Sequence, residues 1–269
     1  MKLLVEAGGT KCKWGIIGDN NDIIETTGFN PNCSSIDNLY TIANDVKAHI
    51  GENVESVLYF GAGCSNRKSE IANVIINVFN CPKVNIHTDL EGAAIALFGK
   101  ESGISAIIGT GSAAGFFNGT AIEQQAPSLG YLLGDEGSGA YLGKTLIAKI
   151  IRKELDNKLC NEFFTFFNTS PSDLIKNVYS NSPANGYLAS FVPFISKNID
   201  NGQLYEMIVD SFQIFHQKHI EPISNLSDKI GFVGGIAYQF KDILREMYID
   251  KGFEIKFLKD AFSELIKFK

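Results

Sequence analysis

The stretches EAGGTK at residues 6–11 and IIGTGS at residues 107–112 decide the fold. Each one joins two apolar segments of strand length through a turn rich in glycine and threonine, which predicts a strand, a tight turn and a returning strand. The two stretches are alike in organisation more than in identity, and one opens each half of the chain. The sequence therefore predicts an α/β protein built from two related halves that share a cleft.

Both turns are rich in hydrogen-bond donors. Their glycines let main-chain N–H groups approach an anion closely, and threonine hydroxyls and a lysine ammonium add further donors. One such turn alone is more often an ordinary hairpin turn, but two that face each other could hold the phosphates of ATP from both sides. The residues concerned are Gly8, Gly9, Thr10 and Lys11 in the first turn and Gly109, Thr110 and Gly111 in the second.

Hydrophobic periodicity gives the two halves a similar order of elements, interrupted in the second half by a weakly periodic region at residues 157–201. The expected strands are residues 2–6, 12–18, 22–27, 54–60, 84–88, 105–108, 113–117, 229–233 and 253–257. The expected helices are residues 36–50, 68–79, 90–98, 140–155, 204–219, 237–247 and 261–268.

Composition places the chain among globular proteins and narrows its partners. Of its 269 residues, 45% are hydrophobic and 20% are charged, and 24 Lys and Arg against 30 Asp and Glu give a net charge of −6. With no basic stripe, this balance argues against a nucleic-acid partner. The sequence has neither GxxxxGK[ST] nor GxGxxG at a strand-to-helix turn, which argues against a P-loop and a dinucleotide-binding fold.

The sequence gives no indication of export or of a membrane partner. The apolar run at residues 1–5 is too short for a signal peptide, and the uncharged stretch at residues 102–122 is rich in glycine, which predicts strand and turn. The five cysteines contain no CxxC pair and fit free thiols in a reducing compartment. We therefore expect a cytoplasmic protein.

Asp89 stands between an expected strand and an expected helix. By position it predicts a helix N-cap, but a carboxylate there could also act as a general base that takes a proton from a phosphoryl-accepting hydroxyl. The two interpretations are compatible. Glu91, two residues later, is better explained as a charge that complements the helix N-terminus.

The motif GDEGSG at residues 134–139 places two carboxylates in a flexible turn before an expected helix. Asp135 or Ser138 could cap that helix. Asp135 could instead accept hydrogen bonds from the neighbouring hydroxyls of a polyol, because a carboxylate offers two acceptor oxygens.

Two further features are weak when taken alone. VGG at residues 233–235 could let a nucleotide approach the main chain closely, or could simply start a helix. His216 and His219 are three residues apart on an expected helix, but a polar helix face explains them as well as a metal pair does.

Several motifs in a fixed order resemble one known family. They are EAGGTK, GFNPN at residues 28–32, YFGAGC at 59–64, TDLEGAA at 88–94, IIGTGS, LGYLLGDEGSG at 129–139 and FVGGIA at 232–237. Together they resemble the BadF/BadG-type ATPase family and, within it, the N-acetylglucosamine kinase-like branch of the sugar kinase, heat-shock chaperone and actin superfamily. The match covers nearly the whole chain. It implies the actin-like ATPase fold, with two ribonuclease-H-like lobes and with ATP and sugar in a central cleft.

The resemblance also implies roles for individual residues. Asp89 would activate the 6-hydroxyl of an amino sugar, with N-acetylglucosamine as the first choice, for phosphoryl transfer from ATP with Mg²⁺. The other implied contacts are Thr10 and Thr110 to the phosphates, Asn32, Ser112, Gly130 and Asp135 to the sugar with Asn30 as a rival of Asn32, and Ala189, Gly234 and Gly235 to the adenosine. The implied lobes span residues 1–102, joined by a terminal helix within residues 258–269, and residues 103–257. Relatives also suggest a homodimer.

Some positions depart from the family pattern. Glu6 stands where members often have Asp, whose carboxylate helps to hold Mg²⁺ through water, and the extra methylene changes the reach of that group. Ala113 and Leu129 stand where amino-sugar kinases often have Asn and Trp. Since specificity rests on polar groups placed for one substrate, N-acetylmuramate or another amino sugar stays open.

Two other functions stay open as well. The family includes activator ATPases that drive electrons into a CoA-ester reductase or dehydratase through an iron–sulfur cluster. The spacings of Cys12, Cys33, Cys64, Cys81 and Cys160 match no cluster signature. A sensor that binds sugar or nucleotide without transfer would act through a protein partner, because the sequence has no basic helix for DNA.

Overall fold

The computed structural model describes residues 1–19, 22–51, 53–181 and 183–267. Its strands are β1 (Lys2–Ala7), β2 (Lys11–Ile16), β3 (Ile23–Thr27), β4 (Ser56–Gly61), β5 (Lys83–Thr88), β6 (Gly103–Ile108), β7 (Ser112–Phe117), β8 (Ile122–Gln125), β9 (Lys229–Val233) and β10 (Glu254–Leu258). Within the described residues these strands form two five-stranded sheets, in the orders β3-β2-β1-β4-β5 and β8-β7-β6-β9-β10. In both orders the first two pairings are antiparallel and the last two are parallel. The predicted duplication is therefore confirmed at the level of topology.

The parallel strands of each sheet end at a common edge. Ala7 of β1 pairs with Gly61 of β4, and Gly61 pairs with Thr88 of β5. The corresponding register in the second sheet brings together the ends of β6, β9 and β10. The loops that follow parallel strands start at such an edge. The first glycine-rich turn and Asp89 therefore start from the edge of the first sheet, and the second glycine-rich turn starts from the matching edge of the second sheet.

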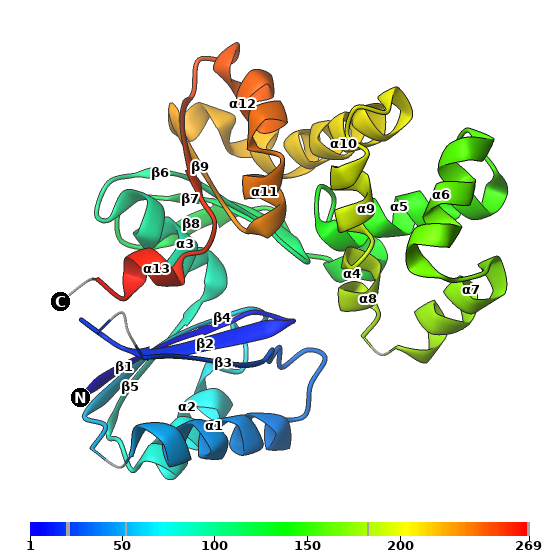
Figure 1. Cartoon of the computed structure of the whole chain (residues 1–269). Helices are drawn as coiled ribbons and strands as arrows, with labels where there is room; N and C mark the ends of the chain where they lie inside the picture. Colours follow the sequence, from blue (N-terminus) through cyan, green and yellow to red (C-terminus); the bar gives the residue numbers. More distant parts are fainter. Residues whose placement is uncertain (20–21, 52, 182, 268–269) are drawn as a thin grey trace.

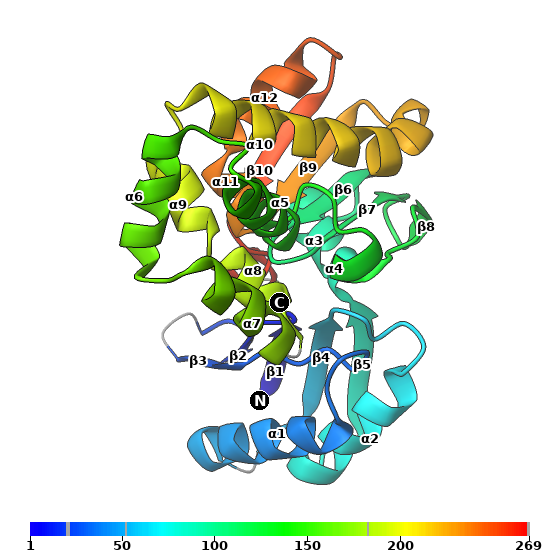
Figure 2. The same cartoon turned by 90° about the vertical axis from the view of Figure 1, so that its right-hand side faces the viewer.

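Helices cover the outer face of each sheet and lie between the two sheets (Figures 1 and 2). In the first half, α1 (Ile36–Ile50) and α2 (Lys68–Phe79) pack on the outer face, while α3 (Asp89–Phe98) lies on the inner face and also contacts the second sheet. The second half contains α4 (Gly130–Leu133), α5 (Gly139–Arg152), α6 (Asn157–Phe167), α7 (Pro171–Ser180), α8 (Asn185–Ala189), α9 (Val192–Lys197), α10 (Gly202–Phe215), a π-helical turn (His216–Ile220), a 3-10 turn (Glu221–Leu226), α11 (Gly235–Gln239), α12 (Lys241–Ile249) and α13 (Phe262–Leu265).

An apolar cluster joins the two halves. It gathers Leu4 of β1, Phe60 of β4, Leu97 of α3, Val233 of β9 and Phe262 of α13, and all five side chains are buried. The cluster lies between the sheets, so the free energy of burying it depends on both halves at once.

The terminal helix α13 packs against β1 and α3. The helix is shorter than predicted, because it ends at Leu265, with Ile266 as its C-cap. Phe268, the predicted last helical residue, lies outside the described residues, as does residue 269. The division of the chain at residue 102 stays a prediction.

The second half differs from the sequence prediction where the apolar pattern is weak. The pattern does not predict β8, because this edge strand is mostly exposed and polar. The weakly periodic region folds into α6 to α9. The expected helix at residues 204–219 is α-helical only as far as Phe215, and the one at residues 237–247 breaks at Phe240, whose φ of −110° is not helical.

We predict that Phe262→Ala lowers the free energy of unfolding by about 3–5 kcal/mol, because it opens a cavity in the cluster that joins the halves. Urea denaturation, followed by the fluorescence of the buried Trp14, measures the change. Tyr179→Ala is the matched control, because this side chain is 86% exposed and its loss should change the free energy by less than about 0.5 kcal/mol. Equal effects of the two substitutions would contradict the prediction.

Candidate active site

The first phosphate turn, at residues 8–10, joins β1 to β2 and rests on Gly28. The N–H of Gly28 donates to the carbonyl of Thr10, and the N–H of Phe29 donates to the carbonyl of Gly8, both at 3.0 Å. A Cβ at residue 28 would lie 2.4 Å from the carbonyl carbon of Thr10, so only glycine fits beneath the turn. The GFNPN motif thus supports the turn as well as leading into the sugar loop that the sequence predicts.

The second phosphate turn, at residues 109–111, joins β6 to β7 and lies against the start of α5. The N–H of Gly139 donates to the carbonyl of Gly109 at 2.8 Å. The hydroxyl of Thr10 donates to the hydroxyl of Thr110 at 3.1 Å. The two turns that the sequence singles out therefore meet, each contributed by a different half of the chain.

Residues that the sequence analysis assigns to adenosine approach the second turn from α8 and from β9. Gly143 of α5 crosses α8 so closely that a Cβ there would overlap the α8 main chain, and a Cβ on Gly139 would lie 3.1 Å from the Cβ of Ala189. Gly234 has a φ of +123°, and a Cβ there would lie 2.4 Å from a carbonyl oxygen at the end of β6. Gly235, which is exposed, then begins α11. These close approaches bring the predicted adenosine residues to the same end of the second sheet as the phosphate turn.

Asp89 is the first residue of α3, but Thr88 caps the helix. The hydroxyl of Thr88 accepts the N–H of Glu91, and the carboxylate of Glu91 accepts the N–H of Thr88, which forms a capping box. The prediction that Asp89 is the cap is therefore wrong, while Glu91 does serve the helix N-terminus. Asp89 accepts the N–H of Leu90 at 2.9 Å, and capping α3 does not require it.

Asp89 and Asp135 form a pair of carboxyl groups, one from each half. Burial raises the pKa of Asp89, the N–H of Leu90 opposes that shift, and the charge of Asp135 adds to it. The pKa of Asp135 is raised as well, first by burial and then by the charge of Glu136. A carboxyl group with a raised pKa in a partly enclosed site is suited to accept a proton from a bound hydroxyl.

Asp135 has a φ of +57°, a backbone conformation that residues other than glycine rarely adopt. Its carboxylate lies over the second phosphate turn, because a Cβ on Gly111 would be 2.9 Å from its Oδ2. The hydroxyl of Ser112 donates to the carbonyl of Glu136 at 2.7 Å, so it holds this loop. Ser138, and not Asp135, caps α5.

The sugar loop at residues 30–32 meets the turn after β4. A Cβ on Gly63 would lie 2.3 Å from Asn30 Oδ1 and 2.8 Å from Asn32 Nδ2, so both side chains pack onto this glycine. Asn30 Oδ1 accepts the N–H of Asn32, while the side chain of Asn32 is exposed. Next to this turn, the thiol of Cys64 donates to the carbonyl of His87, two residues before Asp89. The loop and Asp89 thus belong to one neighbourhood.

Gly130 begins α4 with a φ of +70°, at the edge of the same region. The leucines around it are unusually exposed: 57% for Leu129, 74% for Leu132 and 77% for Leu133. In the first turn, the ammonium of Lys11 pairs with Glu25 of β3. A phosphate contact from this residue would therefore use its main-chain N–H or require the ion pair to break.

Glu6 of β1 faces the start of α13. Burial, the largest effect, and the charge of Asp260 raise its pKa to about 7, although the N–H groups of Ala261 and Phe262 and the charge of Lys13 oppose the shift. Because these N–H groups already occupy the carboxylate, a direct Mg²⁺ contact would compete with them, whereas a contact through water would not. Over the described ranges, no group of three or more His, Cys, Asp or Glu side chains forms a metal site.

Asn185 is a candidate that sequence reasoning misses, because it lies in the weakly periodic region. Its Oδ1 accepts the N–H of Gly186, and its Nδ2 lies 3.8 Å from the position that a Cβ on Gly9 would occupy. Gly186 in turn lies close to the side chain of Thr10. The start of α8 therefore contacts the first phosphate turn from the opposite half. A side-chain amide in a segment without periodicity carries no sequence signal that could have revealed this contact.

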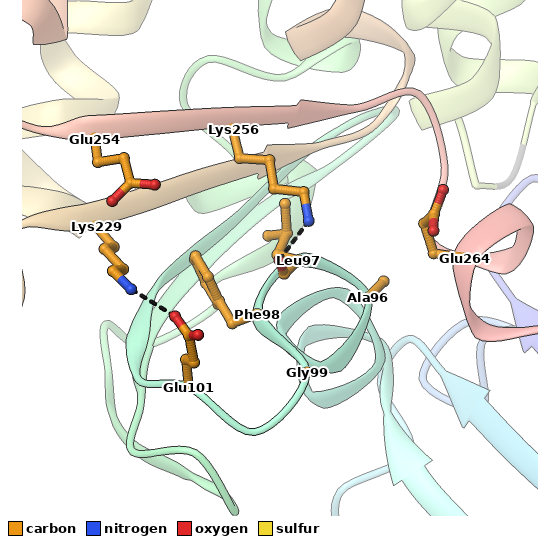
Figure 3. A pocket seen from close by; sticks show the side chains of 9 residues that line it. All are labelled: Ala96, Leu97, Phe98, Gly99, Glu101, Lys229, Glu254, Lys256 and Glu264. Atoms are coloured by element: carbon orange, nitrogen blue, oxygen red, sulfur yellow. Dashed lines mark hydrogen bonds and ion pairs between the residues drawn. The ribbon is translucent and has the colours of Figure 1, made fainter. Parts of the chain in front are cut away.

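A cavity of about 430 Å³ lies away from these residues, between the end of α3, the outer strands β9 and β10, and α13 (Figure 3). Lys229 pairs with Glu101 at 2.5 Å, and Lys256 donates to the carbonyl of Leu97 at 2.7 Å. Both lysines that line the cavity thus have partners within it. The contact of Lys256 with Leu97 joins β10 to α3. None of the predicted site residues lines the cavity.

Solved structures show that the fold is shared with sugar kinases. A candidate N-acetylglucosamine kinase from Porphyromonas gingivalis is 29% identical, with a TM-score of 0.93 over 99% of this chain and 98% of that one. A second candidate N-acetylglucosamine kinase, from Chromobacterium violaceum, is 16% identical, with a TM-score of 0.72 over 98% and 97% of the two chains. A ROK family glucokinase from Streptomyces griseus, solved with glucose and AMPPNP, is 15% identical, with a TM-score of 0.65 over 99% and 97%.

The predicted fold class is confirmed by these similarities and by the sheet topology: the chain has the two-lobe actin-like ATPase fold. No family model and no curated protein matches the sequence. The resemblance to the BadF/BadG-type family therefore stays a prediction that rests on its motifs. None of the helices in the described residues is both long enough and apolar enough to cross a membrane.

We predict that iodoacetamide at pH 8 alkylates Cys33 much faster than Cys12 or Cys64 in the folded protein. Cys33 is exposed, whereas burial raises the pKa of Cys12 to about 12 and that of Cys64 to about 11, so little thiolate forms there. Peptide mass spectrometry over time measures the three rates. Urea-unfolded protein is the control, in which the rates should converge, and similar rates in the folded protein would contradict the prediction.

Proposed function

We propose that the protein is an ATP-dependent kinase that phosphorylates the 6-hydroxyl of an amino sugar, with N-acetylglucosamine as the first choice. The observation that carries the proposal is the meeting of the two phosphate turns at Thr10 and Thr110, with Asp135 against the second turn and its charge acting on Asp89. The similarity to the Porphyromonas protein supports the choice of substrate.

Asp89 is the proposed general base. Its carboxylate would accept the proton of the sugar hydroxyl as the hydroxyl oxygen bonds to the γ-phosphorus and the bond to the leaving ADP oxygen breaks. The raised pKa makes Asp89 a stronger base than an exposed aspartate. Since α3 is fixed between the sheets, its first residue would be held in place while the sugar is positioned against it.

The two phosphate turns would hold ATP, with Ala189, Gly234 and Gly235 beside the adenosine. The hydroxyls of Thr10 and Thr110 are 3.1 Å apart, which is too close for a phosphate to fit between them. The lobes would therefore open to admit ATP and close again around both ligands, which also excludes water from the phosphoryl group.

Mg²⁺ would enter with ATP, and its charge would stabilise the phosphate oxygens during transfer. We propose that Glu6 holds Mg²⁺ through a water molecule, because its carboxylate already accepts the N–H groups of Ala261 and Phe262. Asn185 would add a side-chain donor to the phosphates from the opposite half, since its Nδ2 already faces the first turn.

The sugar would lie between Asp89 and Asp135, with Asn32 as an exposed amide from the first half and Gly130 at the start of α4. Asn32 fits this role better than Asn30, whose Oδ1 is already used within the loop. The exposed Leu129 offers an apolar surface beside these groups, which suits the methyl of an N-acetyl group better than a bare hydroxyl.

The activator function is less well supported by the cysteines. Cys12, Cys64, Cys81 and Cys160 are buried, and Cys33 alone among the five is exposed. An iron–sulfur cluster shared by two subunits would need two accessible thiolates from each. A sensor without catalysis differs from the kinase in a single measurement, the turnover of sugar.

We predict that the wild-type protein releases ADP from ATP and Mg²⁺ only when a suitable sugar is present, and that Asp89→Asn lowers kcat by about 10²- to 10⁴-fold. The amide has a similar shape but cannot take the proton, so sugar affinity should change little. A coupled ADP-release assay with N-acetylglucosamine, N-acetylmuramate, N-acetylmannosamine, glucosamine and glucose measures turnover, and calorimetry measures binding.

Asp242→Asn is the matched control. It makes the same chemical change, from carboxylate to amide, at a side chain that is 78% exposed on α12. Its turnover should equal that of the wild type. Sugar-independent ADP release, or binding of sugar and ATP without turnover, would contradict the kinase and favour the activator or the sensor.

We also predict the pH dependence of kcat/KM for the sugar. A base works only when deprotonated, so activity should fall as the pH drops through the pKa of Asp89. Because that pKa is raised, the midpoint should lie above the value of about 4 that is typical of aspartate. The residual activity of Asp89→Asn should lack this limb, and fluorescence of Trp14 checks that the protein stays folded. A midpoint near 4 would contradict the prediction.

A further inference from the structure

We propose that Glu136, together with Lys218 and His219, positions Asp135 for the sugar and so sets sugar selectivity. The inference deepens the proposed kinase function and rests on it. Nothing in the motif pattern assigns a role to Glu136, and the sequence analysis discounts His219 as half of a metal pair.

The three side chains form an ion cluster around the buried carboxylate of Glu136. Glu136 Oε1 lies 2.5 Å from Lys218 Nζ, and Glu136 Oε2 lies 3.3 Å from His219 Nε2. Glu136 is 4% exposed and His219 is 6% exposed, whereas the side chain of Lys218 is 58% exposed. A carboxylate that is removed from water in this way requires its partners, because losing them would leave an unpaired buried charge.

The π-helical turn at the end of α10 brings the cluster together. An α-helix would continue the polar face on which the sequence places both histidines, but the chain widens into a π-turn at residues 216–220. His216 then contacts the hydroxyl of Tyr248, while His219 turns inward and stacks on Phe215. The interpretation of the two histidines as one polar face is therefore wrong, and each has a separate environment.

The end of α10 also holds the loop just after Asp135. Phe215 packs against Gly137, where a Cβ would lie 3.0 Å from the phenylalanine Cβ. Asp135 has a φ of +57°, which costs free energy in a residue other than glycine and so depends on contacts that enforce it. Further contacts that enforce it are the hydrogen bond from Ser112 to the carbonyl of Glu136 and the ion cluster itself.

The cluster also sets the charge beside Asp135. The charge of Glu136 raises the pKa of Asp135, while the charges of His219 and Lys144 lower it. The Nδ1 of His219 is buried with no hydrogen-bond partner among the described residues, so the cluster is not built for the greatest number of internal contacts. Buried ion pairs are often no more stabilising than apolar residues of similar volume, so stability alone does not explain this cluster.

The steady-state kinetics of Glu136→Gln and Lys218→Met, with N-acetylglucosamine and with glucose, test the proposal. Because Asp135 would lose its fixed orientation, KM for N-acetylglucosamine should rise about tenfold and the preference over glucose should fall, with KM for ATP within about twofold of the wild type. Lys218→Met changes a half-exposed side chain, so it keeps the test valid if Glu136→Gln fails to fold.

Two further variants separate positioning from stability. Glu101→Gln breaks an ion pair of the same length, 2.5 Å to Lys229, outside the cleft, and should leave every kinetic constant unchanged. His219→Phe keeps the ring stacked on Phe215 but removes the contact with Glu136, and should raise KM for the sugar as Glu136→Gln does.

The outcomes distinguish this inference from the proposed function. Unchanged sugar KM in Glu136→Gln and Lys218→Met, with wild-type turnover intact, would overturn the positioning role alone. Parallel rises in KM for ATP and for the sugar, with a lower melting temperature, would overturn it in favour of a structural role. Absence of sugar-dependent turnover in the wild type would overturn the kinase and the inference together.

Discussion

The placement of α3 between the two sheets is the packing constraint on which the candidate site depends. Gly92 lets α3 approach β4, where a Cβ would lie 2.8 Å from the ring of Phe60, and Gly231 lets Leu97 of α3 approach β9, where a Cβ would lie 2.6 Å from the leucine side chain. The helix is thus held by glycines on both sides. Because Asp89 is its first residue, the contact that joins the lobes also fixes the proposed base.

The carboxyl groups of the candidate site explain why a cation belongs in the proposed chemistry. Burial raises the pKa of Glu6, Asp89 and Asp135, and each also feels another carboxylate nearby. Polyphosphate brought into such a region would meet further negative charge, which only donor groups and a bound cation can offset. The main-chain N–H groups of the turns supply part of that compensation, and Mg²⁺ bound to ATP would supply the rest.

The sequence predicts the duplicated fold because strand, glycine-rich turn and strand are local features that can be recognised twice in one chain. It also predicts that the two turns meet, since both start from the ends of strands. It does not predict the cap of α3 correctly, because Thr88 and Asp89 are both good caps and only the geometry selects Thr88. Asn185 and the π-turn around His219 carry no local signal at all, because their positions depend on tertiary packing.

The two halves share a topology but contribute unequally to the candidate site. Between the third and fourth strands, the first half has α1, whereas the second half has the long segment from α4 to the 3-10 turn. That segment supplies Asp135 with its supporting ion cluster, Asn185 beside the first phosphate turn, and Ala189. The duplicated strands lead into the two turns, and β5 leads into Asp89, the proposed base. On the proposed function, much of the sugar selectivity would reside in the added segment, and substitutions there would change the preferred sugar without disturbing the packing of α3 that holds Asp89.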